Sequence, residues 1–101
     1  MAIKMYPVHT WFGDYEVMAY RSTYYGTENL AIQLFTEEEP FATLTVNLGG
    51  FLEPNEAYVD TNNCPWAEDF IKENQLGTFK GFYKNSGYCM YPLYEFDLSK
   101  L

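Results

Sequence analysis

The sequence predicts an α+β domain: a mainly antiparallel, twisted β-sheet of five to seven strands with one α-helix, about residues 64–76, packed on one face. Three observations support this prediction: several segments alternate apolar and polar residues, short turns separate them, and one segment has helix start and stop signals. With 101 residues, 48% of them hydrophobic, the chain has the length and the apolar content of a single domain, residues 1–101.

The first half of the chain predicts a meander of four strands. The clearest pattern is Ala42 to Leu48, where small and aliphatic side chains alternate with Thr43, Thr45 and Asn47. Because the connections are short, neighbouring strands are expected to run antiparallel. Turns are expected at Gly13-Asp14, at residues 26–29 and at the acidic run 37–40. The expected strands are residues 6–12, 15–24, 30–35 and 42–48.

The expected helix has signals at both of its ends. Asn62 and Asn63 are residue types that cap a helix N-terminus, and Pro65 suits the first turn, where its missing N–H costs nothing. Glu68 and Asp69 place negative charge where the helix dipole favours it. The following glycine, Gly77, is expected to end the helix.

One face of this helix is apolar. Trp66, Phe70 and Ile71 have the spacing of a stripe that can pack on a sheet. This packing predicts that Trp66→Ala costs about 3–5 kcal/mol of stability. Further strands are expected at residues 57–60, 79–83 and 91–98, with a turn at 85–87.

Charge and apolar content restrict the class of protein. Fourteen acids against six bases give a net charge of -8, which argues against direct nucleic-acid binding. The first residues lack the apolar run of a secretory signal, and no stretch is long enough to cross a bilayer. We therefore expect a soluble cytoplasmic protein with no membrane contact. Cys64 and Cys89 are expected to be reduced in that compartment, with a disulfide between them as the alternative.

Few residues could support catalysis. Cys64, at the expected helix N-terminus, would be the nucleophile of a thiol-dependent hydrolase, with His9 as base and Asp60 to orient it. The competing interpretation is a small buried cysteine at a helix start. Glu95 and Asp97 share a strand face, yet clustered acids are more often a solvated surface than a catalytic pair. No catalytic residue is assigned.

Metal and cofactor sites are not expected. Cysteine and histidine residues number three in all, fewer than the four ligands of a structural zinc site. Gly49-Gly50 lacks the lysine and the strand-loop-helix setting of a phosphate loop. The acidic run 37–39 is followed by proline and offers no calcium loop.

One segment combines aromatic rings with lysines. Residues 79–94 contain two lysines and no acid. Such a segment can form a protein-binding face, while the competing interpretation is that its rings pack the helix onto the sheet. The candidate binding residues are Phe79, Lys80, Phe82, Tyr83, Lys84 and Tyr88.

The acids of the remaining chain allow a second hypothesis. Carboxylates held along a rigid sheet can imitate the charge of a DNA duplex and so inhibit a nucleic-acid-binding defence enzyme. The acidic patch Glu37, Glu38 and Glu39 is the main candidate. The full set of positions is Asp14, Glu16, Glu28, Glu37, Glu38, Glu39, Glu53 and Glu56.

Two segments resemble a known family. Residues 58–71, which include Asn62-Asn63-Cys64-Pro65-Trp66, and residues 91–98 resemble small uncharacterised bacterial domains often carried on mobile elements of Gram-positive anaerobes. The resemblance covers mainly residues 41–101. It implies no functional residues, because the family has no established activity, and it favours host-defence evasion or regulation over metabolism.

These observations lead to one functional hypothesis and two alternatives. The hypothesis is a non-catalytic acidic module that binds another protein and regulates or inhibits it. The alternatives are the DNA mimic and the hydrolase that uses Cys64. Binding to a basic protein that moderate salt abolishes would indicate the mimic, and loss of activity in Cys64→Ser would indicate the hydrolase.

Overall fold

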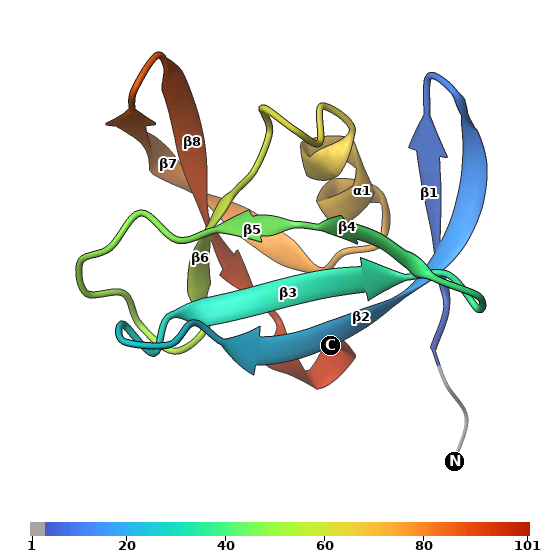
Figure 1. Cartoon of the computed structure of the whole chain (residues 1–101), viewed down its shortest axis with the longest axis horizontal. Helices are drawn as coiled ribbons and strands as arrows, with labels where there is room; N and C mark the ends of the chain where they lie inside the picture. The colour runs from blue at the N-terminus through green and yellow to red at the C-terminus, as the bar shows by residue number, and fades with distance from the viewer. Residues whose placement is uncertain (1–3) are drawn as a thin grey trace.

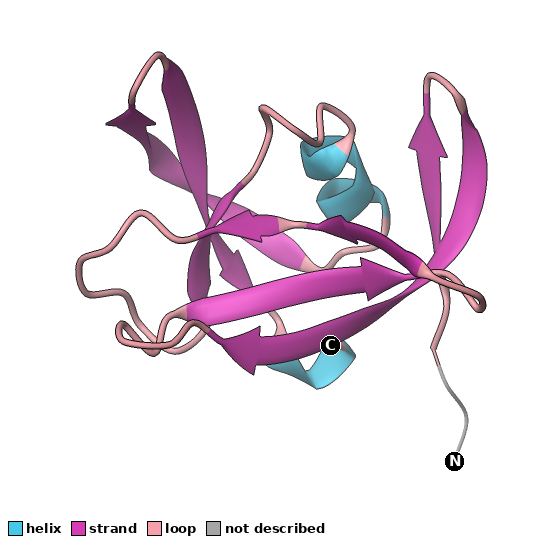
Figure 2. Cartoon of the chain, in the orientation of Figure 1, coloured by secondary structure: helices cyan, strands magenta, loops and turns pink. Residues whose placement is uncertain are grey.

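The computed structural model describes residues 4–101, which form two four-stranded antiparallel sheets and one α-helix (Figures 1 and 2). The predicted α+β class and antiparallel pairing are confirmed, whereas a single sheet of five to seven strands is wrong. The prediction about a secretory signal rests partly on residues 1–3, outside the described part. The strands are β1 (Tyr6–Thr10), β2 (Gly13–Thr23), β3 (Leu30–Phe35), β4 (Pro40–Thr43), β5 (Thr45–Val46), β6 (Glu56–Val59), β7 (Gly77–Ser86) and β8 (Cys89–Phe96). The helices are α1 (Ala67–Glu73) and the 3-10 turn η1 (Leu98–Lys100).

The first sheet has the order β1-β2-β3-β4, so the predicted meander is confirmed. Its long strand β2 changes partner midway: residues 13–17 pair with β1, and residues 18–23 pair with β3. As a result, β1 and the first half of β2 form a hairpin arm that projects from the rest of the sheet (Figure 1). The arm turns at Trp11 and Phe12, not at the predicted Gly13-Asp14, because Gly13 already pairs with Thr10.

The predicted single strand 42–48 is wrong, because the chain passes from one sheet to the other at Leu44. The Leu44 N–H donates to the Ile32 carbonyl at 2.9 Å, and its own carbonyl accepts from the Asp60 N–H at 2.9 Å. Leu44 and Thr45 are both buried, which strict alternation does not allow. The Thr45 hydroxyl is satisfied inside the core, since it accepts from the Ile32 N–H at 3.1 Å and bonds the Tyr24 hydroxyl at 2.9 Å.

The second sheet has the order β5-β6-β8-β7, with β7 at its edge. The β7–β8 turn lies at Gly87 and Tyr88, slightly later than predicted, because Ser86 still pairs with Cys89. Gly77 does not end the helix. A Cβ there would lie 2.7 Å from the Glu95 carbonyl oxygen, so glycine permits the close approach of β7 to β8.

The helix is shorter than the predicted 64–76, and its predicted caps are wrong. Asn63 does not cap it: the Asp60 carboxylate accepts from the Asn63 N–H at 3.1 Å and from its side-chain amide at 2.9 Å. This local turn engages the asparagine before the helix begins. At the other end, Gln75 takes a φ of 54°, and the Leu76 N–H returns to the Ile71 carbonyl at 2.9 Å. That bond closes the helix, whose last residue, Glu73, lies four residues before Gly77.

One core joins the two sheets and the helix. The predicted apolar stripe is confirmed, because Trp66, Phe70 and Ile71 are all buried. The helix contacts both β1 and β7, so it lies between the arm and the second sheet (Figure 1). Within residues 4–101, no helix is long and apolar enough to cross a membrane.

Candidate functional site

The tip of the arm presents two aromatic side chains to solvent. The turn is held locally, because the Thr10 hydroxyl donates to the Gly13 carbonyl at 2.6 Å and accepts from the Phe12 N–H at 3.3 Å. Trp11 is 87% exposed and Phe12 is 53% exposed. Contiguous apolar surface, rather than a single exposed ring, marks interaction sites, and here two exposed rings stand side by side.

These exposed rings are connected to the core through a continuous series of ring contacts. Trp11 lies edge-on to Phe12, with ring centroids 5.3 Å apart, and Phe12 lies 5.8 Å from Tyr15. Tyr15 then contacts Phe41 at 5.0 Å, and Phe41 contacts the buried Trp66 at 5.5 Å. Aromatic pairs at these separations attract beyond their area of burial. The series therefore holds the tip of the arm against β4 and the start of the helix.

A groove of about 380 Å³ lies along this series of rings, and we call it the aromatic groove. Its volume falls in the range of ligand and side-chain pockets. One wall is the arm, another is the β3–β4 turn and β4, and the third is the segment before the helix. The residues that line it are Trp11, Phe12, Tyr15, Thr36, Glu39, Pro40, Phe41, Ala42, Asn63, Cys64, Pro65 and Trp66.

The predicted acidic patch borders this groove. Glu37, Glu38 and Glu39 are exposed on the β3–β4 turn, which Thr36 closes with its N–H on the Glu39 carbonyl at 2.9 Å. The Thr36 hydroxyl also accepts from the N–H groups of Glu38 and Glu39, at 3.4 and 3.2 Å. The three carboxylates and Glu16 surround a second hollow of about 410 Å³. Both hollows share Thr36, Glu39 and Tyr15, so acids and aromatic rings form one surface.

The predicted aromatic and lysine site is distributed between surface and core. Phe79, Phe82 and Tyr83 are 39%, 49% and 48% exposed on the edge strand β7, and Tyr88 is fully exposed at its turn. Tyr94 instead is buried, where its hydroxyl donates to the Glu68 carboxylate at 2.6 Å. Burial is the main cause of the raised pKa of Tyr94, with the Glu68 bond second.

The two lysines of that site have partners within the domain. Lys80 forms an ion pair with Glu95 at 3.0 Å, which raises the pKa of Lys80. The Lys84 ammonium donates to the Leu48 carbonyl at 3.4 Å and lies 5.9 Å from the centre of the Tyr58 ring. The geometry brings these lysines to the same hairpin as the exposed rings, yet engages both of them.

The residues proposed for thiol catalysis do not come together as a triad. Cys64 is buried, and its thiol points at the Thr43 carbonyl, with 3.7 Å between sulfur and oxygen. Burial, followed by the nearby Asp60 charge, raises the pKa of the Cys64 thiol to about 11. A nucleophilic cysteine needs the opposite shift. His9 bonds Asp14 at 3.0 Å, and this bond is the main cause of its raised pKa.

The remaining titratable groups are engaged separately. Glu95 pairs with Lys80, while Asp97 accepts from the hydroxyl and the N–H of Ser99 at 2.6 and 3.1 Å, which lowers the pKa of Asp97. Cys64 and Cys89 are both free thiols. Across residues 4–101, no three His, Cys, Asp or Glu side chains are grouped so that they could hold a metal ion.

Fold and surface together define a small α+β domain with an open aromatic groove beside an acidic turn. The chain belongs to the DUF4313 family, a domain of unknown function, whose family model matches residues 18–101. The resemblance to an uncharacterised domain family is thus confirmed, and it extends further toward the N-terminus than expected. No curated protein and no solved structure matches the chain.

Trp11, Phe12 and Tyr15 were not predicted as site residues. In the sequence, Trp11 and Phe12 fall at the end of an alternating strand pattern, where aromatic residues are ordinary core components. Their exposure arises because the hairpin turns two residues earlier than expected. If the turn is predicted at Trp11-Phe12 instead, both rings are expected to be exposed to solvent.

Proposed function

We propose that this domain is a non-catalytic protein-interaction module that binds its partner through the aromatic groove and the acidic turn beside it. The observation that carries the proposal is Trp11, which is 87% exposed and begins the series of ring contacts leading to Trp66. Truncation of an interface tryptophan often costs more than 2 kcal/mol of binding free energy. A ring already held by its neighbours also loses little conformational freedom on binding.

The acidic rim favours a partner of a particular chemistry. Glu16 and the acidic patch place four carboxylates beside Tyr15, so the complementary surface carries lysine or arginine around an apolar residue that enters the groove. Each exposed ion pair contributes only about 0–1 kcal/mol. The rings therefore supply most of the affinity, while the carboxylates accelerate association and select against acidic partners.

The exposed rings of β7 and its turn offer a second contact surface for the same function. Phe79, Phe82, Tyr83 and Tyr88 are partly or fully exposed on the β7–β8 hairpin, whose strand β8 pairs with β6. Their lysines are less available, because Lys80 pairs with Glu95 and Lys84 donates to Leu48. This difference ranks the β7 surface below the aromatic groove.

DNA mimicry is the alternative that the clustering of Glu16 with the acidic patch favours. The acidic positions do not all join that cluster, however. Glu28 precedes β3, whereas Glu37 follows it, so the length of a strand separates them. A short acidic cluster beside an apolar groove fits a mixed protein interface better than an extended phosphate array.

Affinity capture with matched variants tests the proposal. The wild-type domain, Trp11→Ala, and Tyr25→Ala as the control would each be incubated with source-cell lysate at low and moderately high salt; Tyr25 is a fully exposed ring outside both candidate surfaces. We expect one partner that wild type and Tyr25→Ala retain at both salts and Trp11→Ala loses. A partner retained equally by all three proteins would overturn the groove as the binding site, and complete loss of wild-type binding at the higher salt would indicate the mimic.

A further inference from the structure

Among residues 4–101, the second half of β2 has a neighbouring strand on one side only. Residues 18–23 pair with β3 in regular antiparallel register. On the other side, β1 pairs only as far as Val17, which lies opposite Tyr6. Alternate backbone N–H and C=O groups of a strand point to its two sides. The backbone N–H and C=O groups of residues 18–23 that point toward the β1 side therefore have no strand beside them within residues 4–101.

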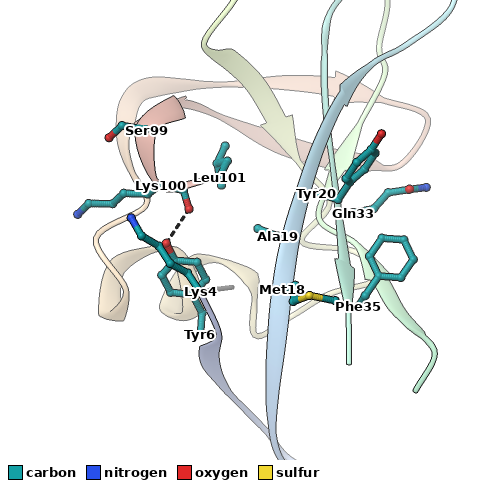
Figure 3. Close-up of a pocket in the computed structure, with 10 residues that line it drawn as sticks. All are labelled: Lys4, Tyr6, Met18, Ala19, Tyr20, Gln33, Phe35, Ser99, Lys100 and Leu101. Carbon is teal, nitrogen blue, oxygen red and sulfur yellow. Dashed lines mark hydrogen bonds between the residues drawn. The ribbon is translucent and has the colours of Figure 1, made fainter. Parts of the chain in front are cut away.

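A largely apolar groove of about 510 Å³ follows this open edge (Figure 3). Met18, Tyr20 and Phe35 lie on one side of the β2 ribbon, and Ala19 and Leu101 lie on the other. Successive side chains of an added strand would alternate between the same two sides. The groove thus provides both features that strand addition requires: an open backbone edge and apolar surface for alternate side chains.

Positive charge gathers at the same edge. Lys4 and Lys100 line the groove, and Arg21 lies within the open segment itself. The Lys100 ammonium also donates to the Gln75 carbonyl at 3.0 Å, so Lys4 and Arg21 are the cations of this edge without such a bond among the described residues. The Tyr6 hydroxyl donates to the Lys100 carbonyl at 2.6 Å, which fixes the turn η1 beside β1 (Figure 3). Lys4, Arg21 and Lys100 are half of the six bases in a chain of net charge -8. Charge complementarity therefore selects an acidic occupant.

The other strand edges carry features that discourage pairing. Proteins protect exposed edges with proline, bulges, charged side chains or very short strands. The open half of β2 has a regular register without proline, and Arg21 is its single charged residue. Elsewhere the protective features are Pro7 in β1, Asp14 and Glu16 in the first half of β2, Pro40 and a register shift in β4, two residues only in β5, and Lys80, Lys84 and a register shift in β7.

We infer that residues 18–23 of β2 bind an extended acidic peptide segment of a partner protein as an added antiparallel β-strand. Backbone hydrogen bonds supply the affinity of such a complex, and side chains supply its selectivity. Acidic side chains of the peptide lie on the side of Lys4 and Lys100, and apolar side chains lie over Met18 and Tyr20. This site uses other residues than the aromatic groove and is tested independently of it.

Titration with a synthetic strand peptide tests this inference. The probe is acetyl-Glu-Val-Glu-Val-Thr-Val-amide, with Lys-Val-Lys-Val-Thr-Val as its charge-reversed control. NMR titration of the labelled full chain is expected to show saturable binding, with amide exchange slowed at residues 18–23. The lysine peptide is expected to bind at least about tenfold more weakly. No binding of the acidic probe at millimolar concentration, or shifts confined to residues 11–15, would overturn the inference.

Backbone methylation separates strand addition from simple burial of an amphipathic peptide. Two versions of the peptide are N-methylated at every second residue, one at the odd positions and the other at the even positions. Both keep all side chains, but only one of them blocks the N–H groups that face β2. We expect one version to bind like the parent and the other to lose at least about tenfold in affinity. Equal binding of the two would contradict the added strand.

Charge variants of the protein test the peptide's orientation. Lys4→Glu combined with Lys100→Glu is expected to weaken the acidic probe at least about tenfold. Lys72→Glu, on the exposed side of the helix, is the control and is expected to leave the affinity unchanged. Equal weakening by both variants would show a general charge effect and would contradict recognition at this edge.

Discussion

Tyr15 packs against Phe41 with their ring centroids 5.0 Å apart, and this contact joins the projecting arm to β4. Tyr15 also lines both hollows, the aromatic groove and the acidic one beside it. The contact thus places an exposed tryptophan, at the tip of the arm, on the same surface as three consecutive glutamates. The proposed binding surface rests on the combination of these two features rather than on either one alone.

The inner end of the aromatic series is expected to stabilise the fold. Trp66 is only 8% exposed and contacts Phe41 and Phe70, so Trp66→Ala should lower the free energy of unfolding by about 3–5 kcal/mol. Trp11→Ala is the matched control and should change stability by less than about 0.5 kcal/mol. Urea denaturation measures both values. Equal effects of the two substitutions would contradict the division between a structural and an exposed tryptophan.

The segment before the helix is expected to depend on Asp60. Its carboxylate accepts two hydrogen bonds from Asn63, so Asp60→Ala should destabilise the domain by about 1–2 kcal/mol. Asp60→Asn retains one acceptor oxygen and should cost less. Thermal and urea unfolding check the order of the two variants. If Asp60→Ala has the same free energy of unfolding as the wild type, the turn that replaces the predicted cap does not contribute to stability.

Cys64 is expected to be unreactive in the folded domain. Because burial raises the pKa of its thiol from 9.0 to about 11, the folded state favours the neutral form. That contribution to stability is complete below about pH 9 and is lost as the pH rises through about 11. A thiol reagent at pH 8 should label Cys89 first and Cys64 only after unfolding, with Cys89→Ser as the control. Rapid labelling of Cys64 in folded Cys89→Ser would restore the hydrolase hypothesis.

The acidic patch is expected to act on binding rather than on folding. In the triple variant Glu37→Gln, Glu38→Gln and Glu39→Gln, affinity for the captured partner should fall and depend less on salt, because fewer charges are screened. The unfolding free energy should change by less than about 0.5 kcal/mol. Titration calorimetry at two salt concentrations measures the effect. The charge-matched control is Glu28→Gln, Glu53→Gln and Asp69→Asn. An equal loss in that control would show that only net charge matters.

Local sequence patterns predicted the elements of this fold better than their boundaries. Alternation located the first three strands, and the spacing of Trp66, Phe70 and Ile71 identified the buried side of the helix. Alternation also predicted one strand over residues 42–48. The passage between sheets at Leu44 depends on hydrogen bonds to Ile32 and Asp60, which are distant in sequence, so no local pattern reveals it.

The helix start shows how one residue type can serve two local structures. Asparagine favours both helix caps and side-chain-stabilised turns. Asn63 was predicted to cap the helix, but the carboxylate of Asp60 lies three residues earlier and accepts its N–H instead. The turn forms instead of the cap because Asp60 directly follows β6, and the position of this strand places the Asp60 carboxylate beside Asn63.

The candidate site was only partly predictable. The acidic patch was identified from its charges, and the structure adds that it borders the aromatic groove. Trp11 and Phe12 were missed because the position of the hairpin turn decides whether they are buried. The rings of β7 were identified as either core or surface, and their place on an edge strand explains why Phe79, Phe82 and Tyr83 are only partly covered.

The most direct test of the central claim is a two-dimensional NMR spectrum of the two indole N–H groups during titration with the captured partner. Trp11 is 87% exposed and Trp66 is 8% exposed, so the two signals report separately on the binding surface and the core. The aromatic groove as the binding site predicts that the Trp11 signal shifts and saturates with the partner, while the Trp66 signal moves less. An unchanged Trp11 signal, with amide shifts confined to residues 79–90, would contradict it and assign binding to the β7–β8 hairpin.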